Sequence, residues 1–362
     1  MEFIDLKSQY IKMKQDIDRS IQGVLDHGKY IMGPEVAECE QQLSEFTQSN
    51  YCITVSSGTE ALLISLMAIG IKPGDEVITT PFTFISTAEV IVLLGAIPIF
   101  VDVEEDTANI NVSLVEEKIS AKTKAIIPVS LYGQPSDMDE LMSIAEKHGI
   151  VVIEDAAQSF GAEYKGRKSC NLSHIGCTSF FPSKPLGCYG DGGAIFTNNE
   201  DYASVIRRIR IHGQSERYVH TEVGVGGRMD TIQCAVVLSK LANFKEEIDK
   251  RLLIGDRYNS LLSGKVKTIA QRRDRTSVFG QYTVVLDNRS AVIDKLKAHG
   301  VPTAVHYPVP VNRQSAYKKF SNDGESPVAD KLSQQVMSLP MHPYLTESDI
   351  EKVSSVLLEA IK

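Results

Sequence analysis

A short, almost continuous apolar run is the strongest constraint on the fold of this chain. Ile150 to Glu154 reads IVVIE, and Asp155 follows at once. Consecutive apolar side chains are typical of a strand in a parallel sheet that is buried on both faces, whereas a half-exposed strand alternates apolar and polar residues. The run therefore predicts an α/β layer structure in which Asp155 stands at the carboxyl end of a buried strand.

The residues before this run complete a βαβ unit. Lys124 to Val129 has the pattern of a strand and Met138 to His148 that of an amphipathic helix, with Asp137 and Gly149 as its start and stop. The same alternation covers roughly the first two hundred residues. It predicts helices over 59–69 and 86–94, strands over 76–79, 97–103 and 194–197, a helix through 209 and a longer helix from 230 to about 253.

The length of the chain indicates two domains, because 362 residues exceed what one hydrophobic core usually organises. We expect a large domain over 1–250 and a small C-terminal domain over 251–362. In the second, the pattern predicts strands at 282–286 and 304–306 and helices at 292–299 and 347–361. The expected fold class is α/β, with a mostly parallel central sheet flanked by helices and a smaller C-terminal α/β lobe.

Composition and charge exclude several classes of protein. The net charge of -8 gives no basic surface for nucleic acid, and the amino terminus mixes charged and apolar residues unlike a signal peptide. The longest apolar stretches, 90–94 and 96–101, are far shorter than the ~20 residues that span a bilayer. We therefore expect a cytoplasmic protein with no membrane or nucleic-acid partner. The six cysteines form no CxxC pair and the histidines lack ligand spacing, so reduced thiols and no metal site are expected.

Asp155 is the first candidate for chemistry, because ligands of parallel α/β sheets bind beyond the carboxyl ends of the strands. The small residues AAQSFG follow it, and no lysine or arginine occurs in the nine residues after it. A cationic ligand such as a protonated pyridine nitrogen would be a suitable partner. This segment alone leaves open the alternative that Asp155 caps the next helix or turn.

Lys184 is the second candidate. It is the one basic residue between Thr178 and Ala194, and it stands between Pro182 and Pro185 in a stretch with four glycines. Prolines fix the backbone and glycines permit close approach to a ligand, so this lysine is held in place. A desolvated lysine amine is a nucleophile that forms Schiff bases with carbonyl compounds. An isolated lysine in a turn would more often be an ordinary surface residue.

A third segment, Ser56 to Leu62 (SSGTEAL), follows the strand-like run YCITV and opens a helix. Backbone amides and hydroxyl groups at a helix start form a site for phosphate, although serine and threonine are also common helix caps. A phosphate site, a carboxylate for a ring nitrogen and a Schiff-base lysine together match the needs of pyridoxal 5'-phosphate.

These segments, with Glu154 to Gly161 and the sequence VHYP at 305–308, resemble the DegT/DnrJ/EryC1/StrS family of nucleotide-sugar aminotransferases. The resemblance runs from Phe3 to Leu345, essentially the whole chain. The string SFFPSKPLGCYGDGGA is especially similar to that of family members that aminate C3 of UDP-2-acetamido-2-deoxy-3-oxo-glucuronate in O-antigen and lipopolysaccharide synthesis.

The resemblance implies a fold type I transferase and a homodimer whose two active sites lie at the subunit interface. It also assigns roles to ten residues. The phosphate would be bound by Gly58, Thr59 and Ser179, the cofactor ring by Phe84, its nitrogen by Asp155, its phenolic oxygen by Gln158, its aldehyde by Lys184, and the sugar nucleotide by Arg228, His306 and Tyr307. Lys184 would also act as acid and base, and it distinguishes the chain from a dehydratase branch that has histidine there.

The implied reaction transfers an amino group from L-glutamate, which leaves as 2-oxoglutarate, to a keto group of a UDP-sugar. Similar enzymes usually carry asparagine where this chain has Gly226, and that asparagine reaches the phosphate across the dimer. Losing one such hydrogen bond costs about 1 to 3 kcal/mol, so activity need not vanish. Three other readings stay open: a lyase of the same fold, a 4-keto-6-deoxy nucleotide-sugar aminotransferase, and a sugar-sensing regulator without catalysis.

Overall fold

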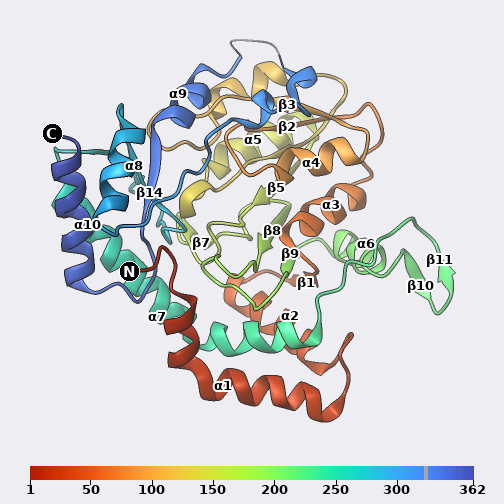
Figure 1. Cartoon of the computed structure of the whole chain (residues 1–362). Coiled ribbons are helices and arrows are strands. Elements are labelled where there is room, and N and C mark those ends of the chain that lie inside the picture. The colour runs from red at the N-terminus through yellow and green to blue at the C-terminus, as the bar shows by residue number, and fades with distance from the viewer. Residues whose placement is uncertain (322–324) are drawn as a thin grey trace.

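The computed structural model describes residues 1–321 and 325–362, and a seven-stranded sheet forms its centre (Figure 1). The strands of this sheet, in the order in which they lie side by side, are β1 (Tyr51–Val55), β9 (Gly193–Thr197), β8 (Ile175–Ser179), β5 (Val151–Asp155), β4 (Thr123–Ile127), β2 (Glu76–Thr79) and β3 (Ile97–Phe100). The strands from β8 to β3 are parallel, whereas β9 is antiparallel to both of its neighbours. The predicted class, α/β with a mostly parallel sheet, is confirmed.

Helices cover both faces of this sheet, which explains why its strands read as continuous apolar runs. On β1, Ile53 joins the hydrophobic cluster under α3 and α6, and its neighbour Cys52 joins the opposite cluster under α2 and α7. The helices of this part of the chain are α1 (Leu6–His27), α2 (Pro34–Thr47), α3 (Gly58–Ala68), α4 (Ser86–Leu93), α5 (Met138–His148), α6 (Glu200–Ile209) and α7 (Thr231–Leu262). Both layers are needed to bury the sheet.

A second, smaller sheet follows in the C-terminal part of the chain and has its own hydrophobic cluster. Its antiparallel strands and the helices near them are β12 (Lys267–Thr268), β13 (Tyr282–Val285), β14 (Val336–Leu339), α8 (Arg289–Ala298), α9 (Pro327–Gln335) and α10 (Glu347–Ala360). The long helix α7 contributes Tyr258 and Leu262 to this cluster. Since α7 runs across residue 250, the division of the chain into domains at that residue stays a prediction.

The remaining elements are short. They are the hairpin strands β6 (Glu163–Tyr164) with β7 (Arg167–Lys168) and β10 (Gln214–Glu216) with β11 (Val219–His220), and the 3-10 helices Val112–Leu114, Glu116–Lys118, Leu131–Gly133, Val311–Arg313 and Lys318–Phe320. The β10–β11 hairpin projects from the body of the protein (Figure 1). No helix in the described ranges is long and apolar enough to cross a membrane.

Some predicted boundaries were wrong. The helix expected to end near residue 253 continues to Leu262, because its later turns pack against the second sheet. The strand expected at 304–306 does not form. There, Ala304 alone makes a bridge to Ser338, and the chain then turns so that the His306 carbonyl accepts a hydrogen bond from the Tyr132 hydroxyl.

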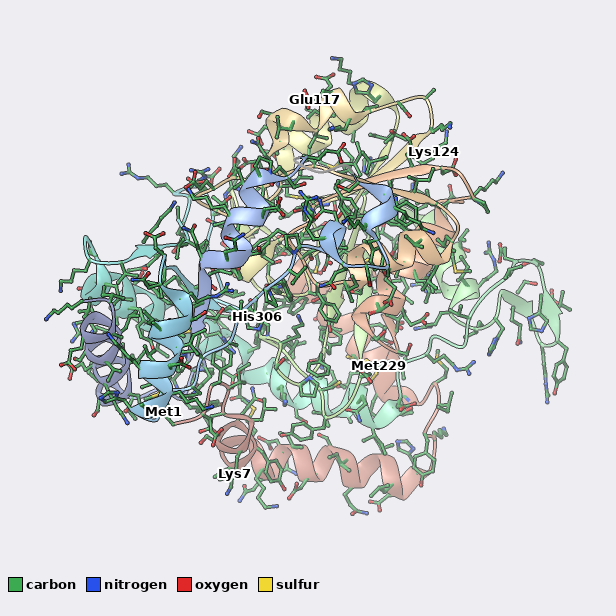
Figure 2. The ribbon with its side chains drawn as sticks, turned by 45° about the horizontal axis from the view of Figure 1, so that its top comes forward. Met1, Lys7, Glu117, Lys124, Met229 and His306 are labelled. Carbon is green, nitrogen blue, oxygen red and sulfur yellow. The ribbon has the colours of Figure 1, made fainter. Side chains whose placement is uncertain are left out.

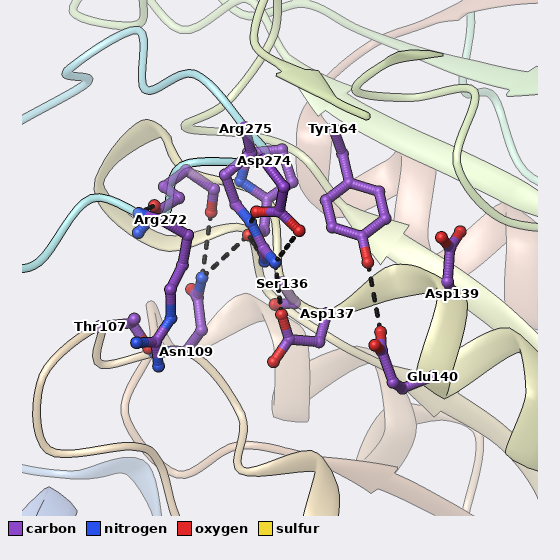
Figure 3. Close-up of polar contacts among 12 residues, drawn as sticks. Thr107, Asn109, Ser136, Asp137, Asp139, Glu140, Tyr164, Arg272, Asp274 and Arg275 are labelled. Atoms are coloured by element: carbon purple, nitrogen blue, oxygen red, sulfur yellow. Dashed lines mark hydrogen bonds and ion pairs between the residues drawn. The ribbon is translucent and has the colours of Figure 1, made fainter. Parts of the chain in front are cut away.

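Arg275 lies in the segment between β12 and β13 and fixes this segment to the residues that connect β4 with α5 (Figure 3). The Arg275 guanidinium donates to the Pro135 carbonyl at 3.0 Å, pairs with Asp137 at 2.5 Å and lies 4.5 Å from the centre of the Tyr164 ring. It is 8% exposed, so solvent does not screen these contacts strongly. The segment therefore reaches β13 along a fixed path.

Candidate active site

A cavity of about 460 Å³ lies where the carboxyl ends of the central strands meet. β1 leads into Ser57, β5 ends at Asp155 and β8 ends at Ser179, and all three residues face this cavity. The lining residues are Ser57, Gly58, Thr59, Leu62, Thr83, Phe84, Ser86, Asp155, Ala157, Gln158, Ser179, Phe181, Ser183, Lys184, Asp191, Gln281, His306 and Tyr307. Nine of the ten residues to which the resemblance gives a role are in this set, and Arg228 is not.

Asp155 is held in one orientation by two hydrogen bonds. The Thr87 hydroxyl donates to its Oδ2 at 2.9 Å, and the Ala157 backbone N–H donates to its Oδ1 at 3.2 Å. Burial raises the pKa of the Asp155 carboxyl, whereas these two bonds and the positive charge of Lys184 lower it. The carboxylate is thus a buried acceptor that gains from a cationic ligand.

Lys184 lies on a tight turn after β8. Its backbone N–H donates to the Phe181 carbonyl at 2.8 Å, and a methyl group on Gly187 would lie 2.6 Å from the Pro182 carbonyl oxygen. Burial lowers the pKa of the Lys184 amine, and the negative charge of Asp155 partly offsets that effect. In the described part of the chain, no hydrogen bond engages the amine. It is available as a nucleophile.

The start of α3 forms a cradle for an anion. Ser57 caps the helix, its hydroxyl accepting from the Glu60 N–H at 3.1 Å, and the first two residues of the helix, Gly58 and Thr59, line the cavity. A methyl group on Gly58 would lie 2.6 Å from the Ser179 Cβ atom. Only glycine therefore lets the start of α3 approach the end of β8 so closely.

Opposite the cradle, Gln158 and Tyr307 are joined by a hydrogen bond from Gln158 Nε2 to the Tyr307 hydroxyl of 3.2 Å. The Tyr132 backbone N–H fixes the other end of the Gln158 amide at 2.9 Å. The ring of Phe84 lies 6.3 Å from that of Tyr307. His306, which lies near the middle of the molecule (Figure 2), has its pKa lowered to about 4 by burial and by the charge of Lys184, so it is neutral at pH 7.

Arg228 and Gly226 belong to a segment that passes outside this cavity. The Ser56 N–H donates to the Gly227 carbonyl at 2.8 Å, so the segment runs beside the start of α3. Among the described residues, Arg228 forms no hydrogen bond or ion pair. A methyl group on Gly226 would lie 3.1 Å from Cε1 of His212, which occupies the space next to it. Within one chain, therefore, the structure does not bring Arg228 to the other predicted site residues.

Several residues of the site were missed by sequence reasoning. Thr87, which holds Asp155 from outside the cavity lining, is separated from it by 68 positions, and Gln281, which lines the cavity, directly precedes β13. Asp191 lies in the same glycine-rich segment as Lys184, where an acidic residue between two glycines was the available indication. Thr87 carried no such indication, because a threonine in an apolar helix is usually a packing residue.

Comparison with known proteins agrees with this geometry. The model of the DegT/DnrJ/EryC1/StrS aminotransferase family matches residues 11–358. The UDP-2-acetamido-2-deoxy-3-oxo-D-glucuronate aminotransferase of Pseudomonas aeruginosa is 54% identical over 99% of both chains. DesV of S. venezuelae, solved in complex with a ketimine intermediate, superimposes with a TM-score of 0.98 at 36% identity, covering 100% of this chain and 98% of DesV. NtdA of Bacillus subtilis with bound cofactor PMP superimposes with a TM-score of 0.91 at 30% identity, covering 97% and 82% of the two chains. The chain belongs to the DegT/DnrJ/EryC1/StrS aminotransferase family.

Proposed function

We propose that this protein transfers the amino group of L-glutamate to C3 of UDP-2-acetamido-2-deoxy-3-oxo-glucuronate with pyridoxal 5'-phosphate as cofactor. The observation that carries the proposal is the meeting of a buried carboxylate, Asp155, and an unpaired amine, Lys184, in one cavity. The full-length similarity to the P. aeruginosa enzyme supports the choice of substrate. The setting would be the cytoplasm and the pathway that of O-antigen sugars.

The residues of the cavity fit this cofactor. Gly58, Thr59 and Ser179 would bind its phosphate, since the close approach of α3 to β8 leaves helix amides facing the site. Asp155 would accept the proton of its ring nitrogen, with Phe84 against the ring and Gln158 near its phenolic oxygen. Lys184 would hold its aldehyde carbon covalently. When bound, pyridoxal phosphate supplies a carbonyl carbon that accepts and releases amino groups and a ring that accepts electrons.

The reaction would then give roles to two of the protein's own side chains. Asp155, held by Thr87 and Ala157, would stay ionised and keep a proton on the nitrogen that it faces. Lys184, once displaced from the carbon it holds, would carry a proton between the two carbon atoms on either side of the transferred nitrogen, as base and then as acid. Glutamate would leave its amino group on the cofactor and depart as 2-oxoglutarate before the keto sugar is aminated, so the Lys184 amine would act in both halves of the cycle.

The charge of the cavity supports a homodimer with shared active sites. Among the described residues that line it, the acidic and basic side chains are Lys184, Asp155 and Asp191, and His306 is neutral, so one chain offers one lysine and no arginine. The proposed substrate carries a diphosphate and a carboxylate, which proteins usually bind with arginine. Arg228 of the partner subunit would supply this charge, and His306 and Tyr307 of the chain itself would contact the sugar. The exposed β10–β11 hairpin is available to reach a second copy.

A substrate panel tests the proposal. The purified protein, loaded with cofactor and glutamate, should aminate the 3-keto UDP-glucuronate derivative at least about a hundredfold more efficiently than 4-keto-6-deoxy sugar nucleotides, because the position of the keto group decides whether it reaches the reacting carbon. Preference for a 4-keto sugar would overturn the substrate. A cofactor-loaded protein whose spectrum does not respond to glutamate would overturn the reaction itself and would favour a sugar-sensing regulator.

A further inference from the structure

Beneath the turn that carries Lys184 lies a second lysine to which the proposed reaction gives no role. Lys240 is on α7 and is 1% exposed. Its Nζ atom donates to the Gly187 carbonyl at 2.6 Å and lies 4.2 Å from the centre of the Tyr189 ring. No ion pair with Lys240 is formed in the described ranges, and burial lowers its pKa to about 8, although the negative charge of Glu247 on the same helix partly offsets this effect.

A buried ammonium group without a carboxylate beside it is costly. Lysine is almost never fully buried unless it is paired, because the charge loses its hydration. Val236, Val237 and Phe244, which lie about one turn away on α7, are fully buried and apolar. Methionine or leucine would fill such a position at lower cost, so packing alone does not explain a lysine there.

The contacts of Lys240 give a better explanation for a lysine at this position. Gly187 closes the turn that begins at Phe181, and the Cys188 N–H donates to the Phe180 carbonyl at 2.7 Å. The backbone of the turn is so compact that Gly187 has no room for a side chain. Its carbonyl is therefore buried against α7, where Lys240 is the donor that satisfies it. An unsatisfied buried carbonyl would favour opening of the turn.

Two other side chains contact Tyr189, which directly follows this turn. The Gln233 side chain accepts from the Tyr189 N–H at 2.8 Å and donates to the Tyr189 carbonyl at 3.3 Å. Tyr10 of α1 meets the Tyr189 ring edge to face, with 6.2 Å between ring centres. The ring of Tyr189 thus has Lys240 within cation–π distance and Tyr10 as a further contact, which favours a charged group at residue 240.

We propose that Lys240 is a positioning residue, whose ammonium group fixes the turn 181–188 from below so that Lys184 faces Asp155. This inference rests on the proposed role of Lys184. It assigns to Lys240 no contact with cofactor or substrate. Its effect is to reduce the number of backbone conformations from which the Lys184 amine can react.

The test is hydrogen exchange of the cofactor-free protein, with Lys240→Met as the main variant. Met keeps the length and apolar stem of the side chain and removes the donor. The backbone amides of Lys184 and Cys188 should exchange about 10 to 100 times faster than in the wild type, as expected when a hydrogen bond from a charged donor to a buried carbonyl is lost. The amides of β4 and β5 should be unchanged.

Lys245→Met is the matched control, because Lys245 is exposed on the same helix. Lys240→Gln is the second variant in case the Met variant does not fold, since glutamine removes the charge with a smaller change of polarity. Lys240→Arg should restore slow exchange. Equal exchange of the turn in wild type, Lys240→Met and Lys240→Gln would overturn the proposal, as would an acceleration spread evenly over the whole sheet.

A second measurement separates this inference from the proposed function. The equilibrium dissociation constant of the cofactor should rise about tenfold or more in Lys240→Met, and kcat should fall with little change in the KM for glutamate. If the proposed function were wrong, neither protein would show cofactor-dependent turnover, but the turn would still exchange faster in Lys240→Met. If only the positioning role were wrong, the variant would bind cofactor and turn over like the wild type.

Discussion

At the scale of single residues, the site depends on groups that lower or raise each other's pKa across the cavity. Lys184 could be predicted because it is the one basic residue in a stretch of prolines and glycines, and Asp155 because it ends a buried strand and precedes small residues. Thr87 could not be predicted, since its hydroxyl meets Asp155 only when the fold has brought the start of α4 to the end of β5. The same limit applies to Lys240, because a lysine in a long amphipathic helix is normally solvated.

The pKa of Lys184 leads to a prediction for the cofactor-free protein. Its rate of reaction with the aldehyde of pyridoxal phosphate should rise with pH around a midpoint below the ordinary lysine value of 10.5, because burial disfavours the ammonium form. In Asp155→Asn the midpoint should move lower still, since the attraction of the carboxylate is lost. Stopped-flow absorbance at several pH values gives both midpoints. A midpoint at or above 10.5 would contradict the burial of this amine.

Thr87 should act through Asp155. Thr87→Val removes the hydroxyl with little change of volume, so the pKa of the Asp155 carboxyl should rise further. Activity that needs the ionised carboxylate disappears as the pH falls through this pKa, so the acid limb of the kcat profile should move to higher pH. We also expect kcat at pH 7 to fall roughly tenfold. Thr87→Ser should restore the profile; an acid limb that does not move in Thr87→Val would exclude this role.

At the scale of elements, the proposed phosphate site depends on the junction between α3 and β8. The sequence predicted α3 to within one residue at each end, because a serine cap and an apolar stretch are local features. It did not predict α1 or α2, and it placed a strand at 304–306 where the structure forms one bridge. Those elements are determined by contacts between distant parts of the chain, such as that between Ala304 and Ser338.

Gly58→Ala tests this junction. The added methyl group would lie 2.6 Å from the Ser179 Cβ atom, so α3 must move away from β8 and the anion cradle must widen. Strain of this kind costs about 1 to 3 kcal/mol, and the affinity for pyridoxal phosphate should fall roughly 10- to 100-fold. Gly23→Ala is the control, because α1 has open space there. Equal affinity in both variants, measured by equilibrium titration, would show that the junction does not hold the phosphate.

At the scale of the whole molecule, the α/β class followed from buried strands and crossover helices, but the assembly could not be read from one chain. Among the described residues, Lys184 is the one lysine or arginine that lines the cavity, and Arg228 lies outside it. A shared site therefore makes a prediction about mixed dimers. Lys184→Ala and Arg228→Ala should each have little activity, and a refolded equimolar mixture should regain roughly a quarter of the wild-type rate. Half of the dimers are then mixed, and one of their two sites is intact.

The mixture can regain this rate only if each active site contains residues of both subunits. The mixture should lose its activity when one subunit carries both substitutions, which serves as the control. A mixture as inactive as its components would place Arg228 and Lys184 in the same chain's site, whereas an Arg228→Ala variant as active as the wild type would remove Arg228 from the reaction. Size-exclusion chromatography with light scattering would establish that the mixed species are dimers.

The most direct measurement of the central claim is to find the atom that holds the cofactor. The protein is incubated with pyridoxal phosphate, reduced with borohydride, digested and sequenced by mass spectrometry. We predict that the cofactor mass is on Lys184 and that Lys184→Ala has neither the label nor detectable turnover with glutamate. Label on another lysine, or steady-state transamination by Lys184→Ala, would contradict the account.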